Sequence, residues 1–559
     1  MERKLLAESI VLVYFEKILI FLFLIVGLWF CLIKNIGMDF SGIPGDLGDA
    51  RFNNYVLEHG YRILSGQEKE IWNAPFFYPF QSTLAFSDNL FGSVPIYSVF
   101  RALSLNREDA FQGWILLSFI SNYAAAAFVL NQMRFNALAV SAGAFLFTFG
   151  LPLLHQDGHP QLFYRFGVPL TFYYCYLFSQ KQRLFLLAVA FFWLVWQFYL
   201  SIYLGAFLAI MLLVMMALLP MFFTGPIDQK LLNWWPRRMK NAWVQSSNKE
   251  RLLTLTAFII LSLGLVVLLE PYYVASNAYK FSKTWDDISS MLPRWQSYLL
   301  AERTSLWKFS SNILPGMLPM RHEHQLFPGL ATVLLILTGV FYRPASPNKK
   351  IAWLNLSTVI IIVLMTLYFR GFSLYQSFWW IPGINSIRAV TRIELVLLWP
   401  MALFIANVIT SIPKNRNKRT LRFQTAIIIF IMLMLFESAS FQLSVFTKTE
   451  AQERLLTLRS KIPESIQENP VLFVSTREGE PWYKTEIDAM LLSQEMGWPT
   501  MNGYSGNFPP GYKLSENCAL VNDRVQSYID YAQIKDKNYF NEMIHRIVPI
   551  GFKNCQPGQ

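Results

Sequence analysis

The stretch GDLGDARFN, residues 45–53, places Asp46 and Asp49 three positions apart, each directly after a glycine. Glycine lets the backbone turn sharply, so Asp46 is expected in a tight loop, where an aspartate often completes an Asx-turn. Asp49 precedes ARFNNYVLEHGYRIL, which can form an interfacial helix, and it can cap the N-terminus of that helix. A carboxylate in either place can instead act as a general base or bind a divalent cation such as Mg²⁺ or Mn²⁺.

Polar side chains also crowd the turn HQDGHPQ, residues 155–161, between two apolar stretches. Placing polar groups at a membrane boundary costs free energy, so such a cluster indicates a functional role. Asp157 can serve as a second acid or position a substrate hydroxyl, a histidine can meet a phosphate, and Gln161 adds a polar contact. A metal site from His155, Asp157 and His159 is an alternative, although their alternation without a well-spaced third ligand is a weak metal pattern.

Two arginines four positions apart, Arg388 and Arg392, stand at the start of a later apolar stretch. On a helix they would face the same way and form a fork that grips a phosphate. The basic residues of most other loops fall on the opposite side of the predicted topology, so snorkelling toward the interface explains these two arginines less well.

Asp88 belongs to FFYPFQSTLAFSDNLFG, residues 76–92, whose aromatic rings and prolines suit a segment lying among lipid headgroups. Asp88 is a candidate substrate contact, and a purely structural interfacial element is the alternative. One further loop adds cations, which an ordinary solvated loop or contact with anionic lipid also explains: Arg294, Arg303, Lys308, Arg321, His322 and His324.

The elements that must hold these residues are membrane helices. Of the 559 residues 54% are hydrophobic and only 15% are charged, and apolar runs near the ~20 residues that cross a bilayer recur along the chain. The net charge of +12 does not indicate nucleic-acid binding, because the basic residues fall in short clusters between these runs. Run lengths predict about eleven spans, at residues 14–35, 111–131, 137–153, 162–179, 184–199, 202–222, 253–271, 326–342, 351–368, 389–411 and 423–441.

The stretch at residues 89–105 is apolar but short, and loop charge favours a re-entrant or interfacial segment there. The N-terminus and the basic loops are then cytoplasmic, and the first span is retained. The long first outer loop, residues 36–110, shares the extracytoplasmic face with the HQDGHPQ turn and with the tail. The predicted organisation is a transmembrane domain, residues 1–441, and a small extracytoplasmic α/β domain, residues 442–559.

Cysteines and common motifs add little. Cys31 and Cys175 lie in apolar spans as packing residues, while Cys518 and Cys555 can pair if the tail faces an oxidising compartment. The sequence contains no Walker loop, GxSxG elbow, HExxH pair or dinucleotide fingerprint.

These features together resemble the GT-C-type integral membrane glycosyltransferases, a class that includes protein O-mannosyltransferases and the lipid A aminoarabinose transferase. The motifs GDLGDARFN, FFYPFQSTLAFSDNLFG, HQDGHPQ, IPGINSIRAVTR and NGYSGNFPPGY look like blocks of uncharacterised bacterial GT-C-like proteins. The resemblance implies a polyprenyl-phosphate-linked sugar donor and transfer to a glycan, lipid or protein acceptor on the outer face of a bacterial inner membrane.

The resemblance matches Asp46 or Asp49 to a first-loop catalytic acid and Asp157 to a second acid of some members. The acids here form GDxxD rather than an adjacent pair or a DxD, so the choice between them, and any metal, stays open. A carboxylate that takes the acceptor proton during a single displacement inverts the anomeric centre. The competing hypotheses are a transporter of a polar lipid or glycan and a non-catalytic envelope-assembly protein.

Overall fold

The structure is a computed structural model that describes residues 2–224, 233–313, 318–342, 346, 348–381, 383–412, 418–476, 479–513 and 520–551. Its described part is mainly helical, with two two-stranded sheets. Cys518 and Cys555 lie outside the described residues, so their pairing stays a prediction, and Cys31 and Cys175 are free thiols.

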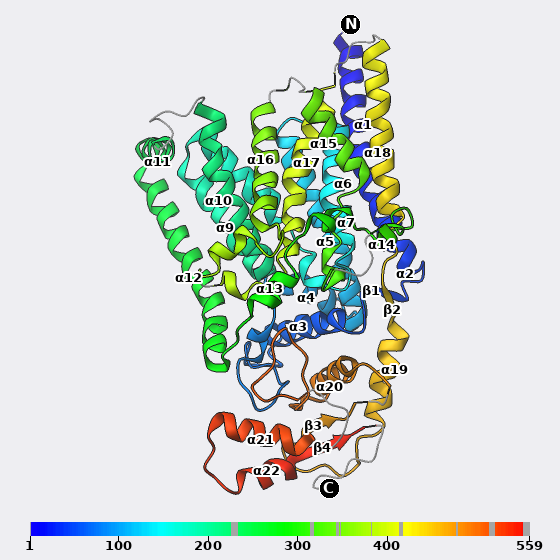
Figure 1. Cartoon of the computed structure of the whole chain (residues 1–559), viewed down its shortest axis with the longest axis vertical. Helices are drawn as coiled ribbons and strands as arrows, with labels where there is room; N and C mark the ends of the chain where they lie inside the picture. Colours follow the sequence, from blue (N-terminus) through cyan, green and yellow to red (C-terminus); the bar gives the residue numbers. More distant parts are fainter. Residues whose placement is uncertain are drawn as a thin grey trace.

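A bundle of long helices forms the larger part of the molecule, with the N-terminus at the end opposite the C-terminal part (Figure 1). Each of the predicted spans coincides with a helix. They are α1 (Glu2–Leu28), continued by η1 (Trp29–Ile33) and α2 (Lys34–Ile36), α5 (Arg107–Gln132), α6 (Ala137–Phe149) with α7 (Leu151–Leu154), α8 (Gly167–Lys181), α9 (Leu184–Leu200), α10 (Ile202–Thr224), α12 (Asn248–Tyr279), α15 (Leu330–Tyr342), α16 (Lys349–Thr366), α17 (Glu394–Thr410) and α18 (Lys418–Ala439).

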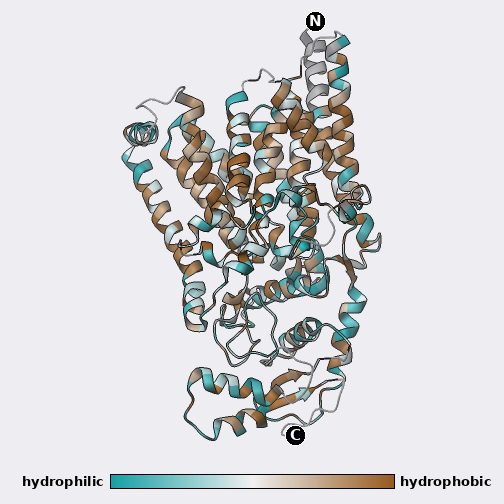
Figure 2. Cartoon of the chain, in the orientation of Figure 1, coloured by the Kyte–Doolittle hydropathy of each residue, from teal (hydrophilic) through white to brown (hydrophobic). Residues whose placement is uncertain are grey.

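Eight helical segments of the described chain are long and apolar enough to cross a membrane, judged by length and composition. The helices α9 and α15 are apolar but shorter, so the number of eleven spans stays a prediction. Figure 2 shows the apolar residues concentrated in this bundle and more polar residues in the C-terminal part. The chain is therefore a polytopic helical membrane protein.

The centre of the bundle is α17, which is almost fully buried, whereas α12 stands at its edge and is largely exposed. Close packing at the centre depends on small residues. A Cβ atom on Gly143 of α6 would lie 3.2 Å from the carbonyl oxygen of Ala402 in α17. Arg165 fixes the start of α17, because its guanidinium donates to the carbonyl of Leu395 at 2.7 Å and to that of Phe147 at 2.6 Å.

The first loop, residues 37–106, contains β1 (Gly42–Pro44), α3 (Asp49–Leu64) and α4 (Val94–Ala102). Helix α3 lies across the end of the bundle (Figure 1), and most of its residues are buried. At nine residues α4 is too short to cross a bilayer. The connections elsewhere contain α11 (Trp234–Gln245), α13 (Trp285–Ser290) and α14 (Ser310–Ile313).

The tail, from residue 442 onward, mixes strands and helices. Its strand β3 (Val471–Val474) pairs in parallel with β4 (Ile547–Ile550). Its strand β2 (Val445–Thr447) pairs antiparallel with β1 of the first loop. Its elements are β2 (Val445–Thr447), α19 (Lys448–Arg459), β3 (Val471–Val474), α20 (Trp482–Met496), α21 (Leu520–Ala532), α22 (Tyr539–Arg546) and β4 (Ile547–Ile550).

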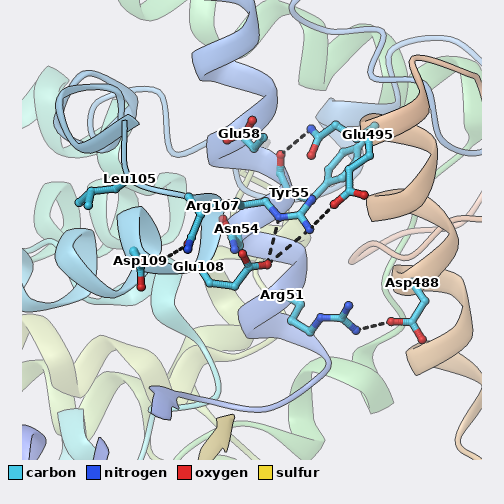
Figure 3. Close-up of polar contacts among 12 residues, drawn as sticks. Arg51, Asn54, Tyr55, Glu58, Leu105, Arg107, Glu108, Asp109, Asp488 and Glu495 are labelled. Atoms are coloured by element: carbon cyan, nitrogen blue, oxygen red, sulfur yellow. Dashed lines mark hydrogen bonds and ion pairs between the residues drawn. The ribbon is translucent and has the colours of Figure 1, made fainter. Parts of the chain in front are cut away.

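Ion pairs hold α3 and α5 against α20 of the tail (Figure 3). Arg51 of α3 pairs with Asp488, and both side chains are almost fully buried. Arg107 at the start of α5 lies 3.1 Å from Glu495 and also contacts Glu108. Removing one partner of a buried ion pair strongly destabilises a protein. These pairs therefore hold the tail against the start of α3.

Candidate functional site

Asp49 is the first residue of α3, and its carboxylate is turned toward other segments. The N-cap of α3 is Gly48, which has no side-chain capping bond, so the predicted capping role of Asp49 is not what the structure shows. Oδ1 of Asp49 accepts a hydrogen bond from the Tyr504 hydroxyl of the tail, and Oδ2 lies 3.3 Å from Nε2 of His159. The carboxylate therefore stands where the first loop, the HQDGHPQ turn and the tail meet.

Asp46 completes the predicted tight turn. Its Oδ1 accepts hydrogen bonds from the N–H groups of Gly48 at 3.0 Å and Ala50 at 3.3 Å, after Gly45 with φ of +114°. Loss of water around its carboxyl group raises the pKa of Asp46, and the charge of Asp49 raises it further. The two acids are therefore close enough to repel each other.

His159 connects Asp49 to a buried ion pair. The same Nε2 atom lies 3.9 Å from Oε1 of Glu323. Burial lowers the pKa of His159, and the charge of Arg392 lowers it further. The imidazole is therefore neutral at neutral pH and can donate its N–H to a carboxylate.

Glu323 and Arg392 form that ion pair. Arg392 donates through Nη2 to Oε1 of Glu323 at 2.6 Å and through Nε to Oε2 at 3.1 Å. Burial alone would raise the pKa of Glu323, but the charge of Arg392, and that of His159 when it is protonated at low pH, lower it to about 2. Glu323 was missed at the sequence level. Its only signal there was an acid among the cations of RHEH.

The two arginines do not form the predicted fork. Residues 390–393 form a 3₁₀ turn, η8 (Val390–Ile393), and α17 begins only at Glu394, so Arg388 and Arg392 do not share an α-helix. Arg392 is committed to Glu323, while Arg388 is exposed and makes no ion pair within the described residues. Tyr203 lies between them, because its hydroxyl accepts from the N–H of Arg388 at 3.4 Å and the Arg392 guanidinium lies over its ring.

Asp157 is held by a cation. Arg303 donates through Nη1 at 2.5 Å and through Nη2 at 2.7 Å, and the N–H of Ser444 donates at 2.6 Å. His155 also has a local role, because its Nδ1 bonds to the carbonyl of Leu151 at 2.8 Å. Burial lowers the pKa of His155 to about 4.

Two further predicted residues make structural contacts. Asp88 accepts from the Ser201 hydroxyl at 2.6 Å and the Ile202 N–H at 2.9 Å, at the start of α10, and burial raises its pKa to about 6. Gln161 accepts from Nδ2 of Asn53 at 2.9 Å, which ties the HQDGHPQ turn to α3. Within the described residues no three His, Cys, Asp or Glu side chains are grouped as metal ligands would be.

Aromatic side chains of the tail cover the acids. The Tyr504 ring centroid lies 5.8 Å from that of Trp482 and 6.3 Å from that of Tyr483. A Cβ atom on Gly48 would lie 3.2 Å from the Tyr483 ring, so glycine lets this ring approach the turn. Partly exposed aromatic rings beside carboxylates and a neutral histidine can bind a substrate and move a proton.

No family model and no curated protein matches this chain. Among solved structures, the archaeal oligosaccharyltransferase AglB from Archaeoglobus fulgidus, in complex with an inhibitory peptide and a dolichol-phosphate, is similar over 93% of this chain and 68% of AglB, at 12% sequence identity and a TM-score of 0.46. An Archaeoglobus fulgidus oligosaccharyltransferase in complex with Zn and sulfate gives a TM-score of 0.48 at 12% identity, over 95% of this chain and 67% of that chain.

The arabinofuranosyltransferase AftD from Mycobacteria is similar at 12% identity and a TM-score of 0.41, over 83% of this chain and 31% of AftD. Both matched enzymes are glycosyltransferases, the class that the sequence motifs resemble.

Proposed function

We propose that this chain is a membrane glycosyltransferase that moves a sugar from a polyprenyl-phosphate-linked donor to an envelope acceptor on the extracytoplasmic face of a bacterial inner membrane. The observation that carries the proposal is the position of Asp49. Its carboxylate stands at the junction of three segments, is held by Tyr504 and His159, and does not cap its own helix. Such a carboxylate suits a general base.

In the proposed reaction Asp49 takes the proton of an acceptor hydroxyl while that oxygen bonds to the anomeric carbon of the donor sugar. The bond between the anomeric carbon and the phosphate oxygen breaks, and the lipid phosphate leaves with the electron pair. One displacement of this kind inverts the anomeric configuration. Arg388 is an exposed cation that could stabilise the leaving phosphate.

The neighbouring residues orient the base. Neutral His159 and the Tyr504 hydroxyl each contact one oxygen of Asp49, and Glu323, which is paired with Arg392, lies 3.9 Å from the same Nε2 of His159. Asp46 shapes the turn. The bidentate contact of Asp157 with Arg303 supports a structural role for that second acid.

The test is turnover of the purified full-length protein in lipid with a panel of polyprenyl-phosphate sugars. Asp49→Asn should reduce transfer by at least about 100-fold, because an amide cannot accept the proton. Asp46→Asn should keep most activity, and Asp39→Asn, an exposed acid of the same loop, should match wild type. An active Asp49→Asn protein with an unchanged unfolding temperature would overturn the proposal.

A transporter of a polar lipid or glycan is the second candidate, and Glu394 is the observation that favours it. This glutamate is fully buried in the candidate span Val390–Thr410, and neither carboxylate oxygen has a hydrogen-bond partner within the described residues. Ionisable residues inside spans often mark transport pathways. Lipid flipping that is lost in Glu394→Gln but kept in Asp49→Asn would favour the transporter.

A further inference from the structure

Helix α11 lies across the direction of the bundle helices, at the end of the bundle that also carries the N-terminus (Figure 1). Two hydrogen bonds tie it to those helices. Nε1 of Trp235 donates to the carbonyl of Met216 in α10 at 2.9 Å, and Nε of Arg238 donates to the carbonyl of Ser179 in α8 at 2.9 Å. Met216 lies roughly two turns before Phe223, the last residue of its candidate span. Helix α11 is therefore held beside the end of that span, at the depth of lipid headgroups.

One face of α11 packs on the bundle and the other is exposed. Trp234 and Ala242 are buried on the packed face. On the exposed face Trp243 and Val244 keep 44% and 66% of their surface accessible, and the guanidinium of Arg251 lies 5.0 Å from the centroid of the Trp243 ring. Tryptophan beside basic side chains is typical of a helix that lies in a membrane interface.

The exposed face of α11 and its surroundings are strongly basic. Residues 233–251 contain five cations and a single acid, Glu250, whose Oε1 atom is buried. The connection between α8 and α9 adds two further cations and no acid, and Nδ2 of Asn241 in α11 donates to Oε1 of Gln182 in that connection at 3.0 Å. None of the exposed cations here forms an ion pair within the described part of the chain: Lys181, Arg183, Arg237, Lys240 and Lys249.

We propose that α11 lies in the headgroup layer and binds anionic phospholipid, with Trp243 inserted at the interface and with Arg237 and Lys240 contacting phosphate groups. An anionic lipid surface complements both the unpaired positive charge and the exposed apolar side chains of this face. Cations that only set the orientation of the neighbouring spans would need neither a packed helix nor an exposed tryptophan beside them. This inference does not depend on the proposed reaction, because α11 lies at the end of the bundle away from Asp49 and the tail (Figure 1).

The test is local lipid contact, measured apart from turnover. The full-length protein in nanodiscs of phosphatidylcholine receives a small share of phosphatidylglycerol that carries a photoreactive group next to its glycerol. After illumination and proteolysis, mass spectrometry locates the modified peptides. The yield within residues 233–251 should be at least about fivefold higher than with a matched phosphatidylcholine probe, since one cation near an anionic surface contributes about that factor. A salt concentration of about 1 M should remove most of this difference.

Paired substitutions identify the cations. Arg237→Gln combined with Lys240→Gln should lower the phosphatidylglycerol yield in residues 233–251 by about tenfold or more, at an unchanged unfolding temperature. Arg237→Lys combined with Lys240→Arg should keep most of the yield. Lys535→Gln combined with Lys537→Gln, which removes two exposed lysines of the tail, should match wild type.

Three results would overturn the proposal. Equal yields with the two lipids would show that α11 lies in the headgroup layer without selecting for charge. An absence of crosslinks within residues 233–251 would leave the exposed face to water or to a soluble acidic partner. A wild-type yield in the folded double glutamine variant would show that Arg237 and Lys240 do not bind the lipid.

Discussion

Oδ2 of Asp49 lies 3.3 Å from Nε2 of His159, although the two residues belong to separate loops of the sequence. The histidine is neutral at neutral pH, so it acts toward the carboxylate as a hydrogen-bond donor rather than as a counter-charge. The orientation of Asp49 therefore depends on a donor that the HQDGHPQ turn supplies.

The first prediction concerns this donor. His159→Gln retains an N–H group of similar reach, so transfer should fall only about tenfold, whereas His159→Leu should lose about 100-fold. The drop should appear in the turnover rate and not in the affinity for polyprenyl phosphate. Equal activity of the glutamine and leucine variants would mean that His159 does not orient the base.

The second prediction concerns pH and Asp46. The pKa of Asp46 is higher in the folded protein than its unfolded value of 3.8. Ionised Asp46 therefore destabilises the fold at neutral pH, and this cost disappears once the pH is low enough to protonate the group in both states. Asp46→Asn should therefore raise the unfolding temperature at pH 7, and the gain should vanish as the pH falls below 3.8. Asp39→Asn is the control with the opposite sign, because hydrogen bonds from Ser41 lower the pKa of Asp39. A gain that is independent of pH would contradict the repulsion between Asp46 and Asp49.

The third prediction concerns Asp157. Its side chain is 4% exposed, and removing its charge leaves Arg303 without its bidentate partner. Asp157→Asn should cost about 2–4 kcal/mol of stability, toward the lower end because Arg303 is 35% exposed. The fraction that stays folded should keep near wild-type turnover. A variant that is stable but inactive would show that Asp157 takes part in the reaction.

The fourth prediction concerns Glu323. Its folded pKa of about 2 lies below the ordinary 4.5, so its contribution is fully present above pH 4.5 and is lost as the pH falls toward 2. Glu323→Gln should therefore be about 3 kcal/mol less stable than wild type at pH 7. The gap in unfolding temperature should narrow between pH 5 and pH 3. A constant gap over that range would show that the charge of Glu323 is not what stabilises the pair.

The helices could be predicted because the length of an apolar run is a local property of the sequence. The tight turn at Asp46 could be predicted for the same reason, since Gly45 and the Asx-turn involve neighbours. The spacing of Arg388 and Arg392 misled because it assumes one continuous α-helix. A 3₁₀ turn separates Arg388 from the first residue of α17.

The partners of the site could not be predicted, because each comes from a distant segment. Tyr504 reaches Asp49 from the tail, Arg303 reaches Asp157 from another loop, and Glu323 reaches His159. No periodicity connects such pairs. Whether these residues come into contact depends on how the helices of the bundle pack. A single sequence does not give that packing.

The pairing of β1 with β2 has a consequence for biosynthesis. Residues 42–44 leave the ribosome early, but their partners, residues 445–447, follow the last helix of the bundle. The strand beside Asp46 must therefore wait, unpaired, while about 400 residues are synthesised and inserted, which makes this a late step of folding. Truncated chains that end before residue 445 cannot form the β1–β2 pairing and also lack Tyr504. They therefore also lack the contact of Tyr504 with Asp49.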